Sequence, residues 1–125
     1  MPIEYTLERK GTLVLANATG VLTVECFLSM QERMKADAGL HSPHSTLLDV
    51  RSATEIRIPE DGLNTIAANL SAGPRRLGAE RLAIVATQEQ VFALGRKYGE
   101  LAKAVRENVI VFCQMTTARI WLGID

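Results

Sequence analysis

Two histidines close together are the first residues in this sequence that could do chemistry. His41 and His44 form an H-x-x-H pair, and Asp49 is nearby in the sequence. A metal ion would need further ligands beside this pair, and Pro43 places it in a loop rather than on a helix. Ser42 next to His44 has no nucleophile elbow around it. We therefore expect solvent-exposed loop histidines, with neither a metal site nor hydrolase chemistry.

Cys113 is the second candidate, because it follows an expected strand and precedes an expected helix. A thiol beside a helix N-terminus can become reactive. No Cys-x-x-Cys motif or neighbouring histidine accompanies it, so we expect a packing role for Cys113, as for Cys26. No nucleophile, base and orienting group occur together in a recognisable context. We expect no catalytic residues, no cofactor and no metal. The alternative is an enzyme with thiol or hydrolase chemistry at Cys113 or His44.

Arginines are the third group. Arg51 and Arg57 flank the segment that follows the Asp49 strand. Arg75 and Arg76 follow the second expected helix. Arginine grips phosphate or carboxylate through two parallel hydrogen bonds, although no glycine-rich phosphate loop is present. These four arginines are candidate contacts for a partner or ligand. The alternative is ordinary surface pairing with Glu55, Asp61 and Glu80.

The composition of the chain limits the classes of function. The 125 residues are 47% apolar and 22% charged, which is typical of one globular domain and excludes wholesale disorder. The 14 basic and 14 acidic side chains cancel, which disfavours nucleic-acid binding. No signal peptide or transmembrane segment is evident. We therefore expect a cytoplasmic protein with reduced thiols.

Apolar periodicity divides the chain into strands and helices. Period-two alternation or short apolar runs predict five strands, at residues 3–8, 13–20, 46–50, 81–86 and 108–112. Helical stripes between them predict four helices. Thr23 is the expected N-cap of the first helix, Pro59 lies in the first turn of the second, and Thr87 and Gln90 form a capping box for the third. The fourth begins at Thr116 or Thr117.

The resulting order, β-β-α-β-α-β-α-β-α, predicts a single α/β domain over residues 1–125. Its five-stranded mixed sheet begins with an antiparallel N-terminal hairpin and continues with parallel strands joined by right-handed crossovers. Ile56 and Ile58 fall in an expected loop over residues 52–58, where they pack under the sheet or form an edge segment or partner contact. Six apolar strand residues are expected to be buried: Val14, Leu47, Ile84, Val85, Ile110 and Val111.

This pattern resembles the bacterial STAS-like family, which has the SpoIIAA-like fold of anti-sigma-factor antagonists and an architecture broadly similar to Sec14-type lipid carriers. The resemblance covers nearly the whole chain and rests on core and cap positions rather than on a catalytic signature. These are Ile3-Glu4-Tyr5, Ala18-Thr19-Gly20, Leu48-Asp49-Val50, Arg81-Leu82-Ala83-Ile84-Val85 and Ala118-x-x-Trp121-Leu122. The resemblance implies a small bacterial, cytoplasmic interaction or ligand-binding domain.

One position departs from the antagonist pattern. Classical antagonists carry Asp-Ser-x-Gly-Leu at the start of the second helix, and that serine is phosphorylated. This chain has Pro59-Glu60-Asp61-Gly62-Leu63 there, so the resemblance implies that Glu60 replaces the phosphorylated serine. We expect no serine switch at this position and a permanently acidic surface, to which Asp61 adds a second charge. The alternative is that Glu60 is an ordinary acid in a first helical turn.

Two functions from different classes follow. On the resemblance, the leading one is non-enzymatic regulation through a protein partner, without nucleic acid. The other is a carrier or sensor of a small amphipathic, lipid-like or anionic ligand, with an apolar tail among the helices and an acidic head at a rim of Arg51, Arg57, Arg75 and Arg76. A homodimer through Trp121 near the chain end is a further expectation. The alternative is that Trp121 packs back on the sheet.

Overall fold

The computed structural model describes residues 2–41, 44–71, 80–102 and 107–124. Strands and helices alternate after an N-terminal hairpin, which is the predicted order. The strands are β1 (Ile3–Glu8), β2 (Leu13–Thr23), β3 (Ser45–Arg57), β4 (Glu80–Val85) and β5 (Glu107–Phe112). The helices are a single 3-10 turn, η1 (Arg9–Gly11), followed by α1 (Val24–Ala36), α2 (Glu60–Ser71), α3 (Glu89–Ala102) and α4 (Met115–Leu122).

The five strands form one mixed sheet in the order β1-β2-β3-β4-β5. β1 is antiparallel to β2, and every later neighbouring pair is parallel. Parallel neighbours need crossover connections, which the helices between the strands supply. The predicted fold class, a single α/β domain with a mixed sheet and an antiparallel edge strand, is therefore confirmed.

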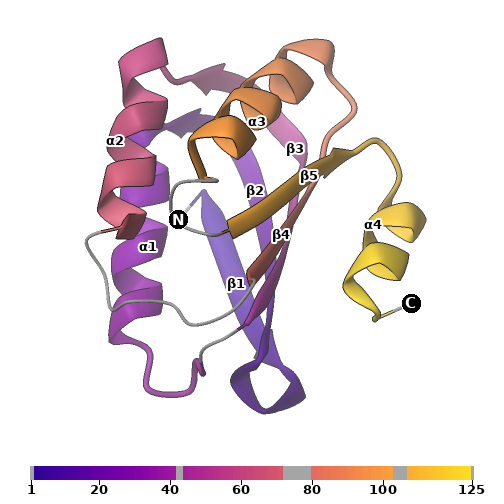
Figure 1. Ribbon diagram of the computed structural model, residues 1–125. Coiled ribbons are helices and arrows are strands. Elements are labelled where there is room, and N and C mark those ends of the chain that lie inside the picture. The colour runs from indigo at the N-terminus through magenta and orange to yellow at the C-terminus, as the bar shows by residue number, and fades with distance from the viewer. Residues whose placement is uncertain (1, 42–43, 72–79, 103–106, 125) are drawn as a thin grey trace.

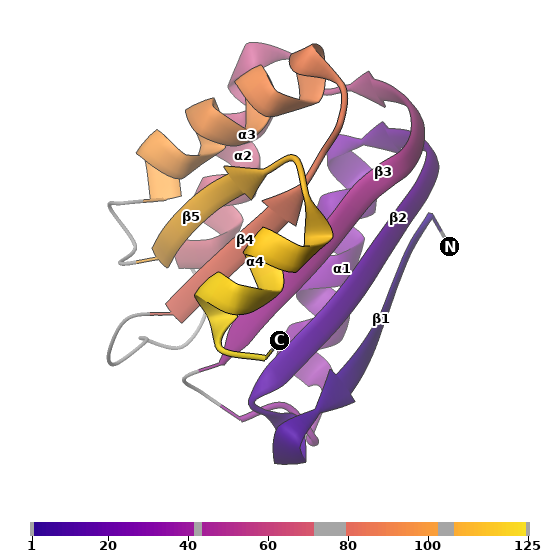
Figure 2. The ribbon, with the colours of Figure 1, turned by 90° about the vertical axis from the view of Figure 1, so that its right-hand side faces the viewer.

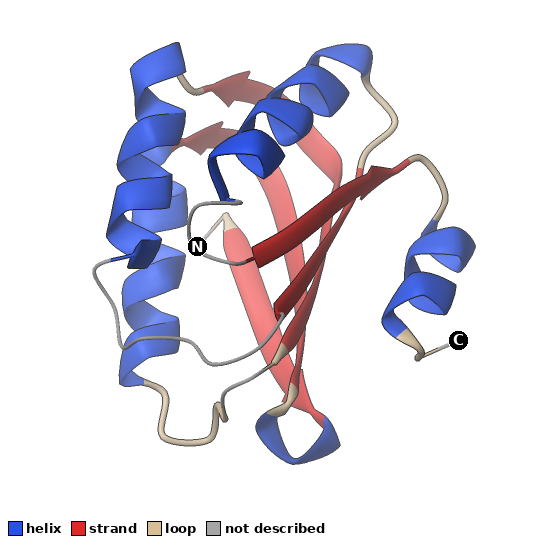
Figure 3. Ribbon diagram, in the orientation of Figure 1, coloured by secondary structure: helices blue, strands red, loops and turns tan. Residues whose placement is uncertain are grey.

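The sheet is covered unequally on its two faces. Of the helices that the structure describes, α1, α2 and α3 lie on one face, and α4 alone lies on the other (Figures 1 and 2). Figure 3 shows the same layers coloured by secondary structure. Each face has its own apolar core. The three-helix core includes Ile3, Leu22, Leu48 and Ile84, while the α4 core includes Leu47, Val85, Ala118 and Leu122.

β3 is longer than predicted. It continues to Arg57 because it pairs in parallel with the second half of β2, from Thr19 to Thr23, beyond the point where β4 ends. The segment that the sequence places in a loop is therefore largely strand, and Ile56 packs against the three-helix core. The expectation of a loop over 52–58 is therefore wrong. The segment has little apolar alternation, but its backbone amides and carbonyls find hydrogen-bond partners on β2.

Burial agrees with the prediction for four of the six apolar strand residues. Val14, Leu47, Ile84 and Val85 are at most 7% exposed. Ile110 is 41% exposed, so its predicted burial is wrong. Val111 is half-buried under α3. Ile110 and Val111 belong to β5, which among the described strands pairs with β4 alone, and an edge strand leaves part of its side chains in solvent.

The helix starts also differ in detail from the predictions. Thr23 precedes α1 as predicted, but its hydroxyl makes no capping hydrogen bond and lies 3.3 Å from the Cys26 Sγ. α3 begins at Glu89, and the amides of Val91 and Phe92 donate to the carbonyl of Gln88. The predicted capping box at Thr87 is therefore wrong, because the chain enters the helix later. α4 begins at Met115, one residue before the earlier predicted start.

Candidate functional site

A small apolar cavity lies between the three-helix layer and the sheet. Its volume is about 100 Å³. The lining comes from α1, α2, α3, β3, β4 and the segment between β3 and α2: Phe27, Met30, Gln31, Leu48, Val50, Ile56, Ile58, Leu63, Ile66, Leu82, Ile84, Val91, Leu94, Gly95 and Tyr98. Residues far apart in the sequence thus meet at one place, which is the strongest candidate binding site in the described part of the chain.

The periodicity of each element places these side chains on the cavity. Leu48 and Val50 alternate along β3, and Leu82 and Ile84 along β4, so each pair points to the same face of the sheet. The helices contribute residues three or four positions apart, which share one helical face. These are Phe27 with Met30, Leu63 with Ile66, and Val91 with Leu94 and Tyr98.

Gln31 is the buried polar residue of the cavity wall. It is 8% exposed. Its Nε2 donates to the carbonyl of Ile66 at 3.2 Å, and its Oε1 accepts from the Asn69 Nδ2 at 2.7 Å. The amide therefore ties α1 to α2, and its oxygen and nitrogen both have protein partners. A buried amide satisfied in this way stabilises the wall instead of offering a strong hydrogen bond to a ligand.

The size and polarity of the cavity define what it can hold. Apolar cavities of about 150 Å³ stay dry and bind benzene. A cavity of about 100 Å³ is suited to a short alkyl chain or a small ring rather than to a complete lipid. Its attraction for such a group is dispersion and the release of apolar surface from water.

Arg51, a predicted contact, forms a close ion pair with Asp49. Its Nε and Nη2 donate to the two carboxylate oxygens at 3.0 and 2.9 Å, and its backbone amide donates at 3.0 Å. The hydrogen bond from the Arg51 side chain is the main cause that lowers the pKa of the Asp49 carboxyl. Leu48 and Val50 face the cavity, so Asp49 and Arg51 face the other side of the sheet.

Arg57 is likewise paired, with the carboxylate of Glu55. This hydrogen bond lowers the pKa of Glu55. Ile56 and Ile58 line the cavity, so the strand period turns Arg57 away from it. Arg75 and Arg76 lie outside the described residues. Arg51 and Arg57 are therefore each paired with an acid two positions earlier in the sequence. Of these two acids, Glu55 is one that the sequence analysis gives as a partner in ordinary surface pairing. Anion binding by these arginines stays a prediction.

The start of α2 holds the segment that resembles the antagonist motif. Glu60 begins the helix, and its side chain lies outside the described part of the structure. Asp61 is exposed. Gly62 lies against α1, since a Cβ built on it would be 2.6 Å from the Val24 Cγ2. Leu63 is buried in the cavity wall. The Gly-Leu pair shared with antagonists thus has a packing role here.

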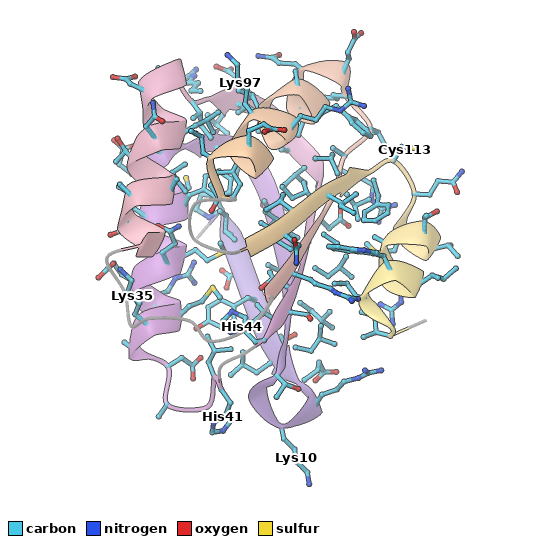
Figure 4. All side chains as sticks on the ribbon, in the orientation of Figure 1. Lys10, Lys35, His41, His44, Lys97 and Cys113 are labelled. Atoms are coloured by element: carbon cyan, nitrogen blue, oxygen red, sulfur yellow. The ribbon has the colours of Figure 1, made fainter. Side chains whose placement is uncertain are left out.

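The histidines and Cys113 lie at opposite ends of the sheet. His41 and His44 precede β3, whereas Cys113 follows β5, and these strands run parallel; Figure 4 shows the separation. His41 is exposed as expected, but His44 is half-buried. Cys113 is exposed, so its expected packing role is wrong, while Cys26 packs against the core as expected. Among the described residues, no three His, Cys, Asp or Glu side chains gather into a candidate metal site.

Trp121 packs on its own domain. Its ring centroid is 5.7 Å from that of Phe112. The Arg81 guanidinium lies 5.4 Å from the centre of the indole, and its Nη1 donates to the Trp121 carbonyl at 2.8 Å. Arg81, Trp121 and β5 border a second, open groove of about 850 Å³.

Comparison with known proteins supports the fold and leaves the function open. No family model matches the sequence, and no curated protein matches it. A solved structure of an uncharacterised DUF3478-family protein from Shewanella loihica, described as having a SpoIIAA-like fold, is similar over 96% of this chain and 93% of that chain. The TM-score is 0.61 and the identity 19%. The chain therefore has a SpoIIAA-like fold, as the sequence resemblance implied.

None of the helices in the described residues combines the length and the apolar character that a membrane crossing requires.

Proposed function

We propose that this chain is a non-enzymatic binding domain that holds a small apolar molecule, or the apolar part of an amphipathic one, between its three-helix layer and the sheet. The observation that carries this proposal is the apolar cavity of about 100 Å³. Leu48 and Ile84 form its floor from the central strands, and Gln31 in its wall already has partners. Such a site binds by exclusion of water and offers no reacting group.

The cavity also sets the expected ligand class. A ligand that fills about 100 Å³ has only a few carbon atoms, and each buried methylene contributes about 0.8 kcal/mol. An affinity limited to this group is therefore weak, in the millimolar to high micromolar range. A longer amphipathic ligand would have its remaining atoms outside the cavity, where the polar surface of the domain would contact them.

Solution NMR tests the proposal with benzene and n-hexanol as probes. Binding should shift the methyl resonances of Leu48, Val50 and Ile84 selectively. Val50→Phe adds carbon atoms to the cavity and should abolish the shifts, whereas the same change at the exposed Val21 should not. Unchanged methyl resonances in the wild-type protein at saturating probe would contradict the proposal. If the probes do bind, native mass spectrometry of the protein purified from its own host would identify a ligand that the protein retains.

A second candidate function is regulation through a protein partner that docks at the start of α2. Two features support it: the resemblance to antagonists in this segment, and the exposed Asp61 close in sequence to the surface pair Arg57–Glu55. In this interpretation Glu60 and Asp61 present a constant negative charge in place of a phosphorylated serine. A protein partner that co-purifies and releases on substitution at Glu60 would support this candidate.

A further inference from the structure

The two edges of the sheet differ in their protection against pairing with another strand. β1 carries two exposed acids, Glu4 and Glu8, and charged side chains along an edge strand oppose such pairing. β5 has no charged residue between Asn108 and Phe112, and its central Ile110 is 41% exposed. Among the described strands β5 pairs with β4 alone, and Figure 2 shows it at the side of the sheet opposite to β1. The edge at β5 is therefore the one suited to a further strand.

The backbone of β5 determines which residues would bond to that strand. The Phe112 carbonyl accepts from the Ala86 amide at 2.9 Å, so the polar backbone groups of Phe112 point toward β4. Backbone groups alternate in direction along a strand, and those of Ile110 therefore also point toward β4. The amides and carbonyls of Val109 and Val111 point the other way, away from the described sheet, where an added strand would lie.

An open groove of about 850 Å³ follows this edge, with α3 as one wall and α4 as the other. The side chains of Val109 and Val111 face α3, because a Cβ built on Gly99 or on Gly95 would contact them. The side chain of Ile110, between the two valines, therefore faces α4. An added strand would find backbone partners at the base of the groove and a different wall on each of its two faces.

The walls of this groove carry more positive than negative charge. The charged residues in its described lining are three cations and one acid: Arg81, Arg96, Lys97 and Glu100. Successive helical residues are turned by about 100° around the helix axis. Because Leu94 faces the cavity and Gly95 faces the sheet, Arg96 lies on the outer flank of α3, above the β5 edge. Lys97 and Glu100 each already take part in an interaction within the chain, so the exposed Arg96 is the cation best placed for a new ion pair.

The opposite wall combines a positive charge with apolar surface. The Arg81 guanidinium lies over the Trp121 indole, and its Nη1 donates to the Trp121 carbonyl at 2.8 Å. These contacts hold the charge of Arg81 beside Trp121, and both residues border the groove together with the exposed Ile110. A segment that carries acidic and apolar side chains would complement both walls.

We propose that the occupant of this groove is an extended acidic segment of another protein, which joins the sheet as a strand beside β5. Its backbone bonds to the outward amides and carbonyls of Val109 and Val111, as in other cases where a peptide extends a sheet. Its side chains beside these valines face α3, where a carboxylate pairs with Arg96. Its side chains beside Ile110 face α4, where an apolar group contacts Ile110 and Trp121. The recognised segment thus alternates acidic and apolar residues.

The close packing of α3 explains why the occupant is a single segment rather than the same edge of a second copy. α3 lies directly above β5, with Gly95 against Val111 and Gly99 against Val109. Paired strands are about 4.8 Å apart, whereas packed helices need about 8–10 Å. Two copies joined through β5 would bring their α3 helices too close together, and a segment without a helix above it has no such conflict. The groove shares no lining residue with the apolar cavity, so this binding does not depend on the proposed function.

Two short peptides test the charge preference and the strand pairing in the intact chain. One has the sequence Thr-Val-Glu-Val-Glu-Val-Thr, acetylated and amidated at its ends, and the other has lysine in place of both glutamates. The glutamate peptide should shift the amide resonances of Val109 and Val111 and slow their hydrogen exchange. It should also bind about tenfold more tightly than the lysine peptide. The chain has no formal net charge, so this preference reports the local charge of the groove. Unshifted Val109 and Val111 amides at the highest soluble peptide concentration, or equal affinity for the two peptides, would overturn the proposal.

Two controls separate the backbone contact from the charge contact. N-methylation of the glutamate and valine amides keeps the side chains and charge of the peptide but removes its donors to β5, and should abolish binding. Arg96→Glu should remove the preference for glutamate. Lys10→Glu makes the same charge change on η1, at the turn between β1 and β2, and should leave the preference unchanged. Both side chains are exposed, so both variants should keep the native far-ultraviolet circular dichroism. Undiminished binding of the N-methylated peptide, or an undiminished preference in Arg96→Glu, would refute the proposal.

Discussion

Gly95 of α3 lies directly against Val111 of β5. A Cβ atom built on Gly95 would be 2.6 Å from the Val111 Cγ2, which is closer than real Cβ contacts. Glycine at this position therefore lets α3 approach the sheet. The same helix carries Val91, Leu94 and Tyr98 to the wall of the cavity. The close approach of Gly95 to Val111 thus helps to set the height of the cavity as well as the position of the β5 edge.

Gly95→Ala should destabilise the domain, and Gly99→Ala should not. A Cβ at Gly99 would be 3.6 Å from Val109, an ordinary contact. Alanine in a helix interior is favoured over glycine by about 0.5–1 kcal/mol, so Gly99→Ala should be neutral or stabilising. Overpacking at Gly95 should cost about 1–3 kcal/mol. Urea unfolding measures both free energies, and equal effects would contradict the close approach.

Gly62 gives a second packing prediction, at the contact between α1 and α2. A Cβ there would be 2.6 Å from the Val24 Cγ2 and 3.2 Å from Ile58. Gly62→Ala should therefore lower the free energy of unfolding by about 1–3 kcal/mol. Val24→Ala removes the nearest obstructing methyl group. The double variant should lose less stability than the sum of the single changes, and simple additivity in a double-mutant cycle would exclude direct contact.

The alternation of strands and helices predicted the topology, because each helical crossover constrains the direction of the strand that follows it. It could not predict how far β3 extends, since residues 52–55 have little apolar alternation and are held by pairing with β2. Ile84 and Ile110 occur in similar apolar runs, yet one is 7% and the other 41% exposed. The difference is their place in the sheet, central or edge, which depends on the strand order rather than on local sequence.

The candidate site was only partly visible in the sequence. The apolar stripes that line the cavity predicted core residues, but an unfilled volume depends on how three helices rest on the sheet. Gln31 and Asn69 were not identified in the sequence analysis, because the residues around a polar position on a helix do not show whether that position is buried. The pairing of Arg57 with Glu55 was foreseen as the alternative to anion binding. Two residues apart on a strand, their side chains share a face.

Gln31→Leu should destabilise the domain although leucine is apolar. The change removes the hydrogen bond from Gln31 to the Ile66 carbonyl and the one that Gln31 accepts from the Asn69 amide, which keeps a longer bond, at 3.4 Å, to the Glu32 Oε2. A buried polar group that loses its hydrogen bond costs about 1–3 kcal/mol. Gln31→Leu combined with Asn69→Leu also removes the Asn69 amide that has lost its bond to Gln31 and should recover part of the loss. Thermal unfolding checks both, and a fully stable Gln31→Leu would show that the amide contributes no net stability.

Tyr5 should titrate at high pH and make the domain sensitive to alkali. Burial first, and the hydrogen bond from its hydroxyl to the Asp37 Oδ2 at 2.8 Å second, raise the pKa of Tyr5 to about 12. The native state therefore keeps this proton where the unfolded chain, with a pKa near 10, releases it. Stability contributed by the protonated phenol is complete below pH 10 and is lost as pH rises toward 12.

Tyrosinate absorbance in a Tyr98→Phe variant isolates Tyr5, since the chain has two tyrosines. Asp37→Asn should bring the pKa of Tyr5 closer to its ordinary value, because Asp37 raises it by hydrogen bonding and by charge. Tyr5→Phe should flatten the loss of stability with rising pH. An ordinary Tyr5 titration in the folded protein would contradict both the burial of the phenol and its hydrogen bond to Asp37.

The acidic start of α2 distinguishes a charge-dependent docking surface from an ordinary helix start. Glu60 is the first residue of α2, where a negative charge is favoured by the helix dipole. Glu60→Gln and Glu60→Ser should each lower the free energy of unfolding by about 0.3–1 kcal/mol, and Glu60→Lys should lower it further.

If a partner uses this charge, its affinity should fall most with lysine and partly with glutamine, beyond what the change in stability explains. A carboxylate carries less charge than a phosphoserine, so phosphorylation of the Glu60→Ser variant should not weaken such a partner's binding. Equal affinity across all the variants, measured by calorimetry alongside an Asn64→Gln control on the same helix, would leave Glu60 as a helix-start residue alone.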